Sequence, residues 1–233
     1  MIDWHSHILP GVDDGSRDVA ESISLIQMQS AQGVSTIMAT PHFYANDGTV
    51  ETFLERREKA YGELKSQLSE DAPAILLGAE VRYYPGISHM DGLKHLRLQG
   101  SRVLLLEMPM TRWTEFTIRE LIELSRMHEY QLVLAHVERY LRLQTRSCWP
   151  RLLESGILFQ VNASFFTAFG ARQKALSFLK NGKIHLLGSD CHNLDTRKPR
   201  IGEAFACIER KFGNDYLRQM NELGRSLLDT MNN

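Results

Sequence analysis

The chain has 233 residues, of which 43% are hydrophobic and 24% charged, and its formal net charge is −1. These values indicate one globular domain over residues 1–233 and give no electrostatic reason to expect nucleic acid or an acidic membrane as a partner. No apolar run approaches the roughly 20 residues that span a bilayer, so insertion into a membrane is not expected.

Short apolar strands alternate with amphipathic helices along the whole chain. Asp18 is the expected N-cap of the first helix, with Glu21 completing a capping box. Seven strands alternating with helices indicate a parallel α/β sheet with right-handed crossovers. Strands are predicted over 1–5, 35–39, 74–79, 102–107, 131–136, 157–162 and 184–189. Helices are predicted over 18–32, 50–69, 115–129, 147–155, 171–181, 201–212 and 215–230.

Histidines and acidic residues follow the ends of most of these strands. An open doubly wound sheet gathers its site at one switch point, whereas a barrel brings the carboxyl ends of all its strands to one mouth. Because the candidates come from nearly every strand, we favour a distorted seven-stranded TIM-like (βα) barrel with a metal site at the C-terminal ends of the strands. The candidates are Asp3-Trp4-His5-Ser6-His7, His42, Glu80, Glu107, His136 and Asp190-Cys191-His192.

Imidazole and carboxylate are the side chains that hold divalent metals. His5 and His7 are one residue apart and leave a strand on the same face, and the same spacing puts Asp190 and His192 together with Cys191 facing away. A single such pair is weak evidence, since surface histidines are common. The number of strand ends that carry ligand types favours a polynuclear metal site. The other histidines are interpreted as structural or surface residues: His89, His95, His128 and His185.

These motifs resemble the PHP (polymerase and histidinol phosphatase) superfamily of metal-dependent phosphoesterases. Within it, the chain is similar to the bacterial manganese-dependent tyrosine-protein phosphatases of capsular and exopolysaccharide gene clusters. The resemblance implies a distorted seven-stranded βα barrel and three bound Mn²⁺ ions, with Mg²⁺, Fe or Zn²⁺ as alternatives. It rests on His5-Ser6-His7-Ile8-Leu9-Pro10-Gly11-Val12-Asp13-Asp14-Gly15-Ser16, Ala39-Thr40-Pro41-His42, Gly78-Ala79-Glu80-Val81, Leu106-Glu107-Met108-Pro109, Ala135-His136-Val137-Glu138-Arg139-Tyr140 and Gly188-Ser189-Asp190-Cys191-His192-Asn193.

The same resemblance implies three sets of ligands. Glu107 and Asp14 stand where many members of the superfamily have histidines, and oxygen-rich ligation suits manganese or magnesium. Asp13 competes with Asp14, and the sequence leaves this choice open. The first metal takes His5, His7, Glu80 and Asp190; the second takes Glu80 as a bridge, Glu107 and His136; the third takes Asp14, His42 and His192.

Such a site hydrolyses a phosphate ester by metal-activated water and needs no protein nucleophile. Arg139 and Arg197 are the candidates for binding the phosphate through their guanidinium forks. A surface ion pair with Glu138 is the alternative for Arg139, and Arg200 competes with Arg197. Exposed charge or helix capping is the alternative for both of these later arginines.

Cys191 and Arg197 have the C-x5-R spacing of cysteine-dependent tyrosine phosphatases. The intervening segment has no glycine and contains Asp195, which would repel phosphate. We interpret the match as accidental. Several aromatic residues near strand ends either shape a slot for an aryl phosphate or pack loops onto helices: Phe43, Tyr44, Phe165, Phe166 and Phe169.

The resemblance implies a phosphotyrosine protein as substrate, namely a bacterial tyrosine kinase that controls polysaccharide polymerisation and export. Three alternatives remain: a phosphoesterase acting on a small phosphate such as histidinol phosphate or a nucleotide, a zinc amidohydrolase-like barrel, and a non-catalytic metal-binding or regulatory subunit. Amidohydrolases often use a bridging carboxylated lysine, and no lysine lies at a predicted strand end.

The early position of Asp3 leaves no room for a signal peptide, and three cysteines without CxxC spacing favour a reduced, cytoplasmic setting. The oligomeric state is left open.

Overall fold

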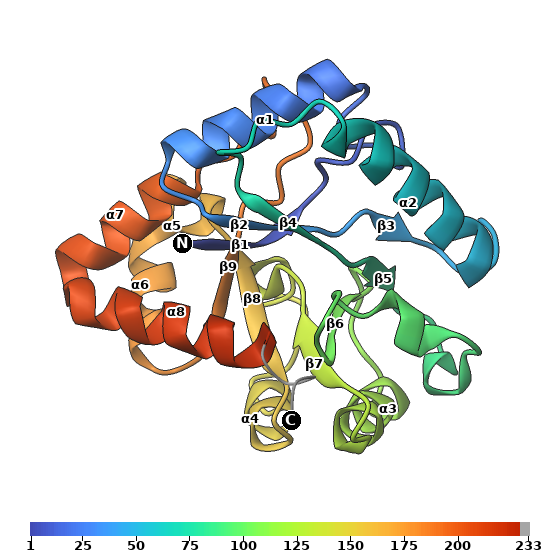
Figure 1. Ribbon diagram of the computed structural model, residues 1–233. Helices are drawn as coiled ribbons and strands as arrows, with labels where there is room; N and C mark the ends of the chain where they lie inside the picture. The colour runs from blue at the N-terminus through green and yellow to red at the C-terminus, as the bar shows by residue number, and fades with distance from the viewer. Residues whose placement is uncertain (229–233) are drawn as a thin grey trace.

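The computed structural model describes residues 1–228. Its fold is α/β, with a curled parallel sheet that is covered on its outer face by helices (Figure 1). All seven predicted strands are confirmed, and two short strands are added to them. The strands are β1 (Ile2–Ser6), β2 (Thr36–Ala39), β3 (His42–Phe43), β4 (Ala74–Leu77), β5 (Glu80–Arg82), β6 (Val103–Glu107), β7 (Gln131–Leu134), β8 (Leu158–Asn162) and β9 (Leu186–Gly188).

The seven predicted helices are also confirmed, with shorter ends in places. The helices predicted over 50–69 and 115–129 stop at Lys65 and Arg126, and the short helix α5 was not predicted. Residues 229 and 230 of the predicted helix 215–230 lie outside the described residues. The helices are α1 (Val19–Ala31), α2 (Val50–Lys65), α3 (Glu115–Arg126), α4 (Cys148–Glu154), α5 (Ser164–Thr167), α6 (Arg172–Lys180), α7 (Ile201–Phe212) and α8 (Asn214–Leu228), with 3₁₀ turns η1 (Ile87–His89), η2 (Leu93–Leu96) and η3 (Val137–Arg139).

Hydrogen bonding divides the strands into two parallel sheets, β1-β2-β4 and β3-β5-β6-β7-β8-β9. β2 pairs with β4. Their short continuations, β3 and β5, pair with each other, and His42 lies opposite Glu80 in that pair. Thr40-Pro41 separates β2 from β3 and Gly78-Ala79 separates β4 from β5. Proline has no N–H to donate to a ladder, so an interruption at Pro41 is expected.

The segment after β9 returns to the carboxyl end of β1 (Figure 1). Ser6 and Cys191 form an isolated parallel bridge, and the amide of Asp190 donates to the carbonyl oxygen of His5 at 2.8 Å. The Asp3 carboxylate adds a side-chain link by accepting from the amide of Ser189 at 2.7 Å. The first and last strands of the chain therefore lie next to each other.

Apolar side chains fill both faces of the curled sheet. On β2, Ile37 and Ala39 pack outward under the helices, whereas Met38 belongs to the inner cluster. Leu227 of α8 joins the inner cluster beside Ile2. Buried histidines and acidic residues gather at the carboxyl ends of the strands: His5, His7, Glu80, Glu107, His136, Asp190 and His192. No helix within residues 1–228 is long and apolar enough to cross a membrane.

Candidate metal centre

Glu80 lies at the middle of a cluster of imidazoles. Its Oε2 is 3.2 Å from Nε2 of His5, 3.3 Å from Nε2 of His7 and 2.9 Å from Nδ1 of His42. Its Oε1 is 2.7 Å from Nε2 of His136. Glu80 is the first residue of β5, so the interruption after β4 places this carboxylate between the ends of β1, β3 and β7. The predicted bridging position of Glu80 agrees with this geometry.

His5 and His7 meet as their spacing predicts, with their Nε2 atoms 3.0 Å apart. Two glycines make room for them. A Cβ on Gly188 would lie 2.5 Å from Cβ of His5, and one on Gly15 would lie 2.2 Å from the carbonyl oxygen of His7. Both positions therefore admit only glycine without a backbone shift.

Asp190 and His192 reach the cluster, but not from a regular strand. Asp190 has φ 51° and His136 has φ 33°, so both have left-handed backbones that are uncommon for residues other than glycine. Oδ1 of Asp190 lies 3.5 Å from Nε2 of His7 and 3.6 Å from Nδ1 of His192. Such backbone conformations concentrate at functional sites, where the surrounding structure holds them.

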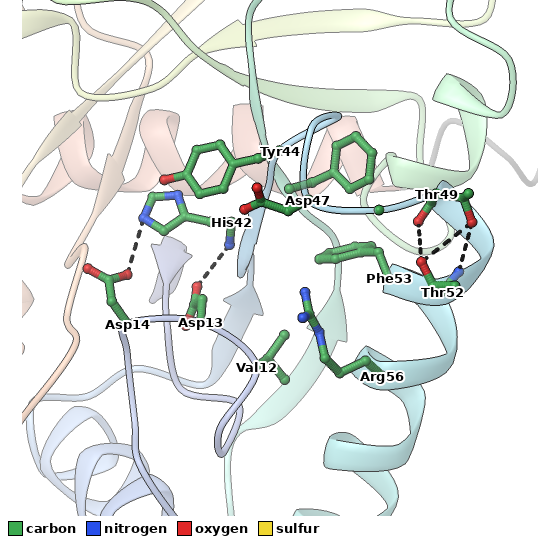
Figure 2. A pocket seen from close by; sticks show the side chains of 12 residues that line it. Val12, Asp13, Asp14, His42, Tyr44, Asp47, Thr49, Thr52, Phe53 and Arg56 are labelled. Carbon is green, nitrogen blue, oxygen red and sulfur yellow. Dashed lines mark hydrogen bonds and ion pairs between the residues drawn. The ribbon is translucent and has the colours of Figure 1, made fainter.

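The two neighbouring aspartates take different positions. Asp13 accepts from the amide of His42 at 2.8 Å and lies 2.6 Å from Nδ1 of His7. Asp14 points Oδ1 toward Nε2 of His42 at 3.4 Å (Figure 2), and the same oxygen lies 3.4 Å from Nε2 of His192. The geometry therefore puts Asp14 with the imidazoles of the third predicted set, and Asp13 behind His7.

Glu107 lies at the edge of the cluster, at the end of β6. Its Oε1 is 3.7 Å from Nε2 of His136, and its Oε2 accepts from Nη1 of Arg82 at 2.7 Å. Each of the nine predicted ligands thus has an atom within 3.9 Å of another member of the cluster.

Four of the imidazoles are oriented in the same way. Each has Nε2 directed at a carboxylate of the cluster and Nδ1 next to a protein oxygen. Metal-binding histidines typically use one nitrogen for the ion and are fixed through the other. The Nδ1 partners are Gln160 Oε1 for His5 (3.4 Å), Asp13 Oδ2 for His7 (2.6 Å), Tyr140 Oη for His136 (3.0 Å) and the Asp190 carbonyl for His192 (3.0 Å).

The donor set fits divalent cations. Within the described residues, three groups have ligand atoms close enough to share an ion: His5, His7 and Asp190; His42, Glu80 and Glu107; and His7, Asp14, His42 and His192. They reproduce the predicted sets in part, with His42 in the place of His136 in one group and His7 added to another. Two buried nitrogens face carboxylates of the cluster, Nδ1 of His42 toward Glu80 at 2.9 Å and Nε2 of His192 toward Asp14 at 3.4 Å.

The carboxylates and imidazoles of the cluster shift one another's pKa values. Burial opposes a charge on His7, but its contacts with Asp13 and Glu80 raise its pKa to about 10. Burial likewise opposes ionisation of Glu80, yet His5, His136 and His42 hold its pKa well below the ordinary value. Because a bound cation needs a neutral imidazole, binding at His7 would displace its proton.

Both predicted phosphate-binding arginines, Arg139 and Arg197, form ion pairs with Asp190. Arg139 of η3 contacts Oδ2 of Asp190 rather than Glu138, and Nη2 of Arg197 donates to Oδ1 at 2.8 Å. Their side chains remain 36% exposed, which leaves them accessible from the mouth of the cluster. Arg200 instead pairs with Glu203 on α7 at 2.7 Å, so Arg197 is the arginine that reaches the centre.

Cys191 is buried on the far side of its chain segment. Its Sγ is 3.4 Å from Nε2 of Gln29 on α1, and burial raises the pKa of the thiol. A buried, protonated thiol is a poor nucleophile. This geometry agrees with the interpretation of the C-x5-R spacing as accidental.

Four polar residues around the centre were missed in the sequence. Gln160 accepts from the amide of His136 at 2.7 Å, and Asn162 donates to Oδ2 of Asp190 at 2.6 Å. Tyr140 contacts His136, and Arg82 donates to Glu107. Polar residues at alternate positions of the apolar strand 157–162 were the available signal for Gln160 and Asn162. Nothing local in the sequence marks Tyr140 or Arg82.

The aromatic residues near the strand ends divide between two roles. Phe43, Phe165 and Phe166 are buried in the core, as ordinary packing predicts, whereas Phe169 is fully exposed. Tyr44 stacks on the ring of His42, with centroids 5.2 Å apart and planes 23° from parallel. Among the other histidines, His185 accepts from the amide of Phe159, and none joins the cluster.

The chain is similar to known proteins over nearly its whole length. Residues 1–223 match the family described as capsular polysaccharide synthesis, CpsB/CapC. The tyrosine-protein phosphatase YwqE of Bacillus subtilis is 33% identical over 236 residues, which cover 98% of this chain and 91% of that protein. The tyrosine-protein phosphatase CpsB of Streptococcus agalactiae is 32% identical over 233 residues, 94% of each chain.

A solved structure is also similar. It is described as one of the crystal structures of YwqE from Bacillus subtilis and CpsB from Streptococcus pneumoniae, unique metal-dependent tyrosine phosphatases. It matches with a TM-score of 0.84 and 27% identity, over 98% of this chain and 94% of the other.

Proposed function

The chain belongs to the CpsB/CapC family of capsular polysaccharide synthesis, and from this premise we propose that it is a metal-dependent protein-tyrosine phosphatase. The observation that carries the proposal is the convergence of imidazoles and carboxylates around Glu80, in a chain similar to curated tyrosine-protein phosphatases. Its reaction is the hydrolysis of a phosphotyrosine monoester by water.

The nine clustered residues are the proposed ligands of three divalent ions, preferably Mn²⁺. Four carboxylates, those of Asp14, Glu80, Glu107 and Asp190, give the set the oxygen-rich character that suits manganese or magnesium. When bound, such ions supply Lewis acidity to the phosphate and raise the acidity of water. The protein holds the imidazoles in the orientation that binding requires, through Gln160, Asp13, Tyr140 and the Asp190 carbonyl.

Arg139 and Arg197 are the proposed phosphate-binding residues. Each guanidinium has five N–H donors, and its contacts with Asp190 leave donors free for the oxygens of a phosphate. Charge that develops on those oxygens during in-line transfer is stabilised by fixed cations of this kind. Water is the nucleophile, because Cys191, the one cysteine next to the ligands, is buried and faces Gln29.

The proposed substrate is a phosphotyrosine protein of capsule or exopolysaccharide synthesis, specifically a bacterial tyrosine kinase. Support comes from the family description and from the names of the relatives. We place the protein in the cytoplasm because its three cysteines are unpaired and two of them are buried, as is typical of a reducing compartment.

We further propose that residues 1–233 form a single, distorted seven-stranded barrel, in which β2 with β3 and β4 with β5 each count as one interrupted strand. The bridge between Ser6 and Cys191 supports closure between the first and last strands.

The test measures hydrolysis of p-nitrophenyl phosphate and of a phosphotyrosine peptide after chelation, and again with Mn²⁺, Mg²⁺ or Zn²⁺ restored. We expect chelation to abolish both activities and Mn²⁺ to restore them best. His136→Ala should lower both by more than about 100-fold, because loss of a ligand costs more than the 10–100-fold typical of its supporting partners.

Cys191→Ser should keep most of the activity and serves as the matched control. Activity that resists chelation and disappears in Cys191→Ser would contradict the proposal and favour a cysteine mechanism. Activity on a small phosphate alone would instead favour a small-molecule phosphoesterase.

A further inference from the structure

A deep pocket opens beside the metal centre (Figure 2). Its volume is about 710 Å³, and Asp14 and His42 of the proposed third ligand set form part of its wall. The rest of the wall comes from the loop between β3 and α2 and from the first turns of α2, including Thr49, Phe53 and Arg56. A substrate bound at the metals would therefore extend into this pocket.

The pocket is larger than one phosphorylated side chain requires. Drug-sized ligands occupy pockets of about 300–1,000 Å³, so this one has room for the residues that flank a phosphotyrosine. Val12, Phe43 and Phe53, although largely buried, contribute apolar atoms to its wall, and Tyr44, which stacks on His42, lines it as well. An aromatic ring carrying the phosphate is suited to that end of the pocket.

Arg56 places a positive charge elsewhere in the same pocket. It lies on the second turn of α2, and Figure 2 shows its guanidinium group extending toward the space between Val12 and Phe53. It is exposed and makes no hydrogen bond or ion pair within residues 1–228. Its neighbour Arg57 behaves differently, because it is buried and donates to the carbonyl oxygen of Gly78 at 2.9 Å.

The acidic residues of the pocket do not neutralise Arg56. Asp13 is engaged with His7 and the amide of His42, and Asp14 faces His42 and His192. Asp47 also lines the pocket and forms no ion pair with Arg56. A guanidinium without a partner at a binding surface favours a carboxylate, which it can bind through two parallel hydrogen bonds.

We propose that Arg56 is a specificity-determining residue that binds an acidic side chain close to the phosphotyrosine of the substrate. The inference rests on the proposed function and adds the kind of sequence that the site selects. Arg56 lines the same pocket as Asp14 and His42, and an extended peptide advances about 3.3–3.6 Å per residue, so the acidic residue lies within a few positions of the phosphotyrosine.

The experiment compares kcat/KM for three phosphotyrosine peptides that carry glutamate, glutamine or lysine at the flanking positions, each relative to p-nitrophenyl phosphate. We expect the wild type to prefer the glutamate peptide. Arg56→Glu should lower the ratio for the glutamate peptide about 10–100-fold, the range of a charge-assisted hydrogen bond, and raise the ratio for the lysine peptide. Arg210→Glu, an exposed arginine of α7 on the opposite side of the molecule, should leave all ratios unchanged (Figure 1).

Equal changes for the three peptides in Arg56→Glu would overturn the inference, as would a wild type that hydrolyses the three peptides equally well. Both results would leave the phosphatase activity intact. Hydrolysis of p-nitrophenyl phosphate with no hydrolysis of any peptide would overturn the proposed function and this inference together.

Discussion

At the scale of single residues, the candidate centre consists of proposed ligand atoms and of the groups that orient them. The ligand types were predictable because imidazoles and carboxylates after strand ends are conspicuous in a sequence. The orienting groups were not, because Gln160 and Tyr140 act only through the positions of His5 and His136 in space. The choice between Asp13 and Asp14 also needed the structure, since the turn at 13–15 decides which carboxylate faces His42.

Tyr140 provides the first test at this scale. Its hydroxyl accepts from the amide of Met108 at 3.1 Å and lies 3.0 Å from Nδ1 of His136. We expect Tyr140→Phe to raise the Mn²⁺ concentration for half-maximal activity about 10–100-fold, as loss of an orienting partner of a metal ligand typically does. A titration of p-nitrophenyl phosphate hydrolysis against Mn²⁺ measures it.

The matched control is Tyr130→Phe, a half-buried tyrosine whose hydroxyl makes no hydrogen bond within residues 1–228. The two variants should differ in the Mn²⁺ requirement. The same requirement in both would mean that Tyr140 does not orient His136.

At the scale of elements, the strands were predictable from their apolar runs and the interruptions were not. The predicted strand 74–79 breaks after Leu77, and Glu80 starts a new pairing with β6. The predicted strand 131–136 stops at Leu134, because the left-handed backbone of His136 turns the chain out of the sheet. Tertiary contacts at the centre, rather than local preference, determine these ends.

At the start of α1, the predicted N-cap is confirmed and the predicted capping box is wrong. Asp18 is the N-cap, and its Oδ1 accepts from the amide of Glu21 at 2.9 Å, as predicted. The predicted reciprocal bond of the capping box is absent. The Glu21 carboxylate accepts instead from the amide of Arg17 at 2.9 Å, one residue before the cap.

Asp18→Ala should therefore destabilise the protein by about 1 kcal/mol, the typical cost of losing an N-cap acceptor. The free energy of unfolding in urea measures this loss. Ser147→Ala is the control, because Ser147 precedes α4 without a side-chain cap hydrogen bond and should cost less. Equal losses in the two variants would contradict a capping role for Asp18.

At the scale of the whole molecule, the sequence pattern predicted a parallel sheet that gathers its strand ends, and the structure agrees. The pattern did not predict the division into two hydrogen-bonded sheets. That division depends on two short interruptions, at Pro41 between β2 and β3 and at Gly78 between β4 and β5. The role of α8 was equally hidden, because an amphipathic helix can cover many surfaces. Here Gly224 allows close contact with the ring of Trp4, where an added Cβ would lie 3.1 Å away.

Cation binding should stabilise this whole arrangement, because the proposed ligands come from β1, β3, β5, β6 and the loops after β1, β7 and β9. A ligand at 100 times its Kd contributes about 2.7 kcal/mol to the folded state. For a chain of this size we expect Mn²⁺ to raise Tm by about 5–10 °C over the chelated protein. Thermal unfolding followed by circular dichroism measures the change.

Glu80→Gln should remove most of this rise, whereas His128→Ala, an exposed histidine away from the cluster, should keep it. A rise that persists in Glu80→Gln would show that Mn²⁺ stabilises the protein from another place.

The bond between Ser189 and the carbonyl oxygen of His5 joins residues 184 positions apart, and it has a consequence for synthesis. A ribosome that adds about 5–20 residues per second needs about 10–40 s to cover that interval. During that time His5 and His7 are present on the nascent chain without Asp190 or His192. An ion captured during this interval would lack these two proposed ligands, one of which is a carboxylate of the oxygen-rich set that suits manganese. The proposed ligand set is therefore complete only after the last strand has joined the first.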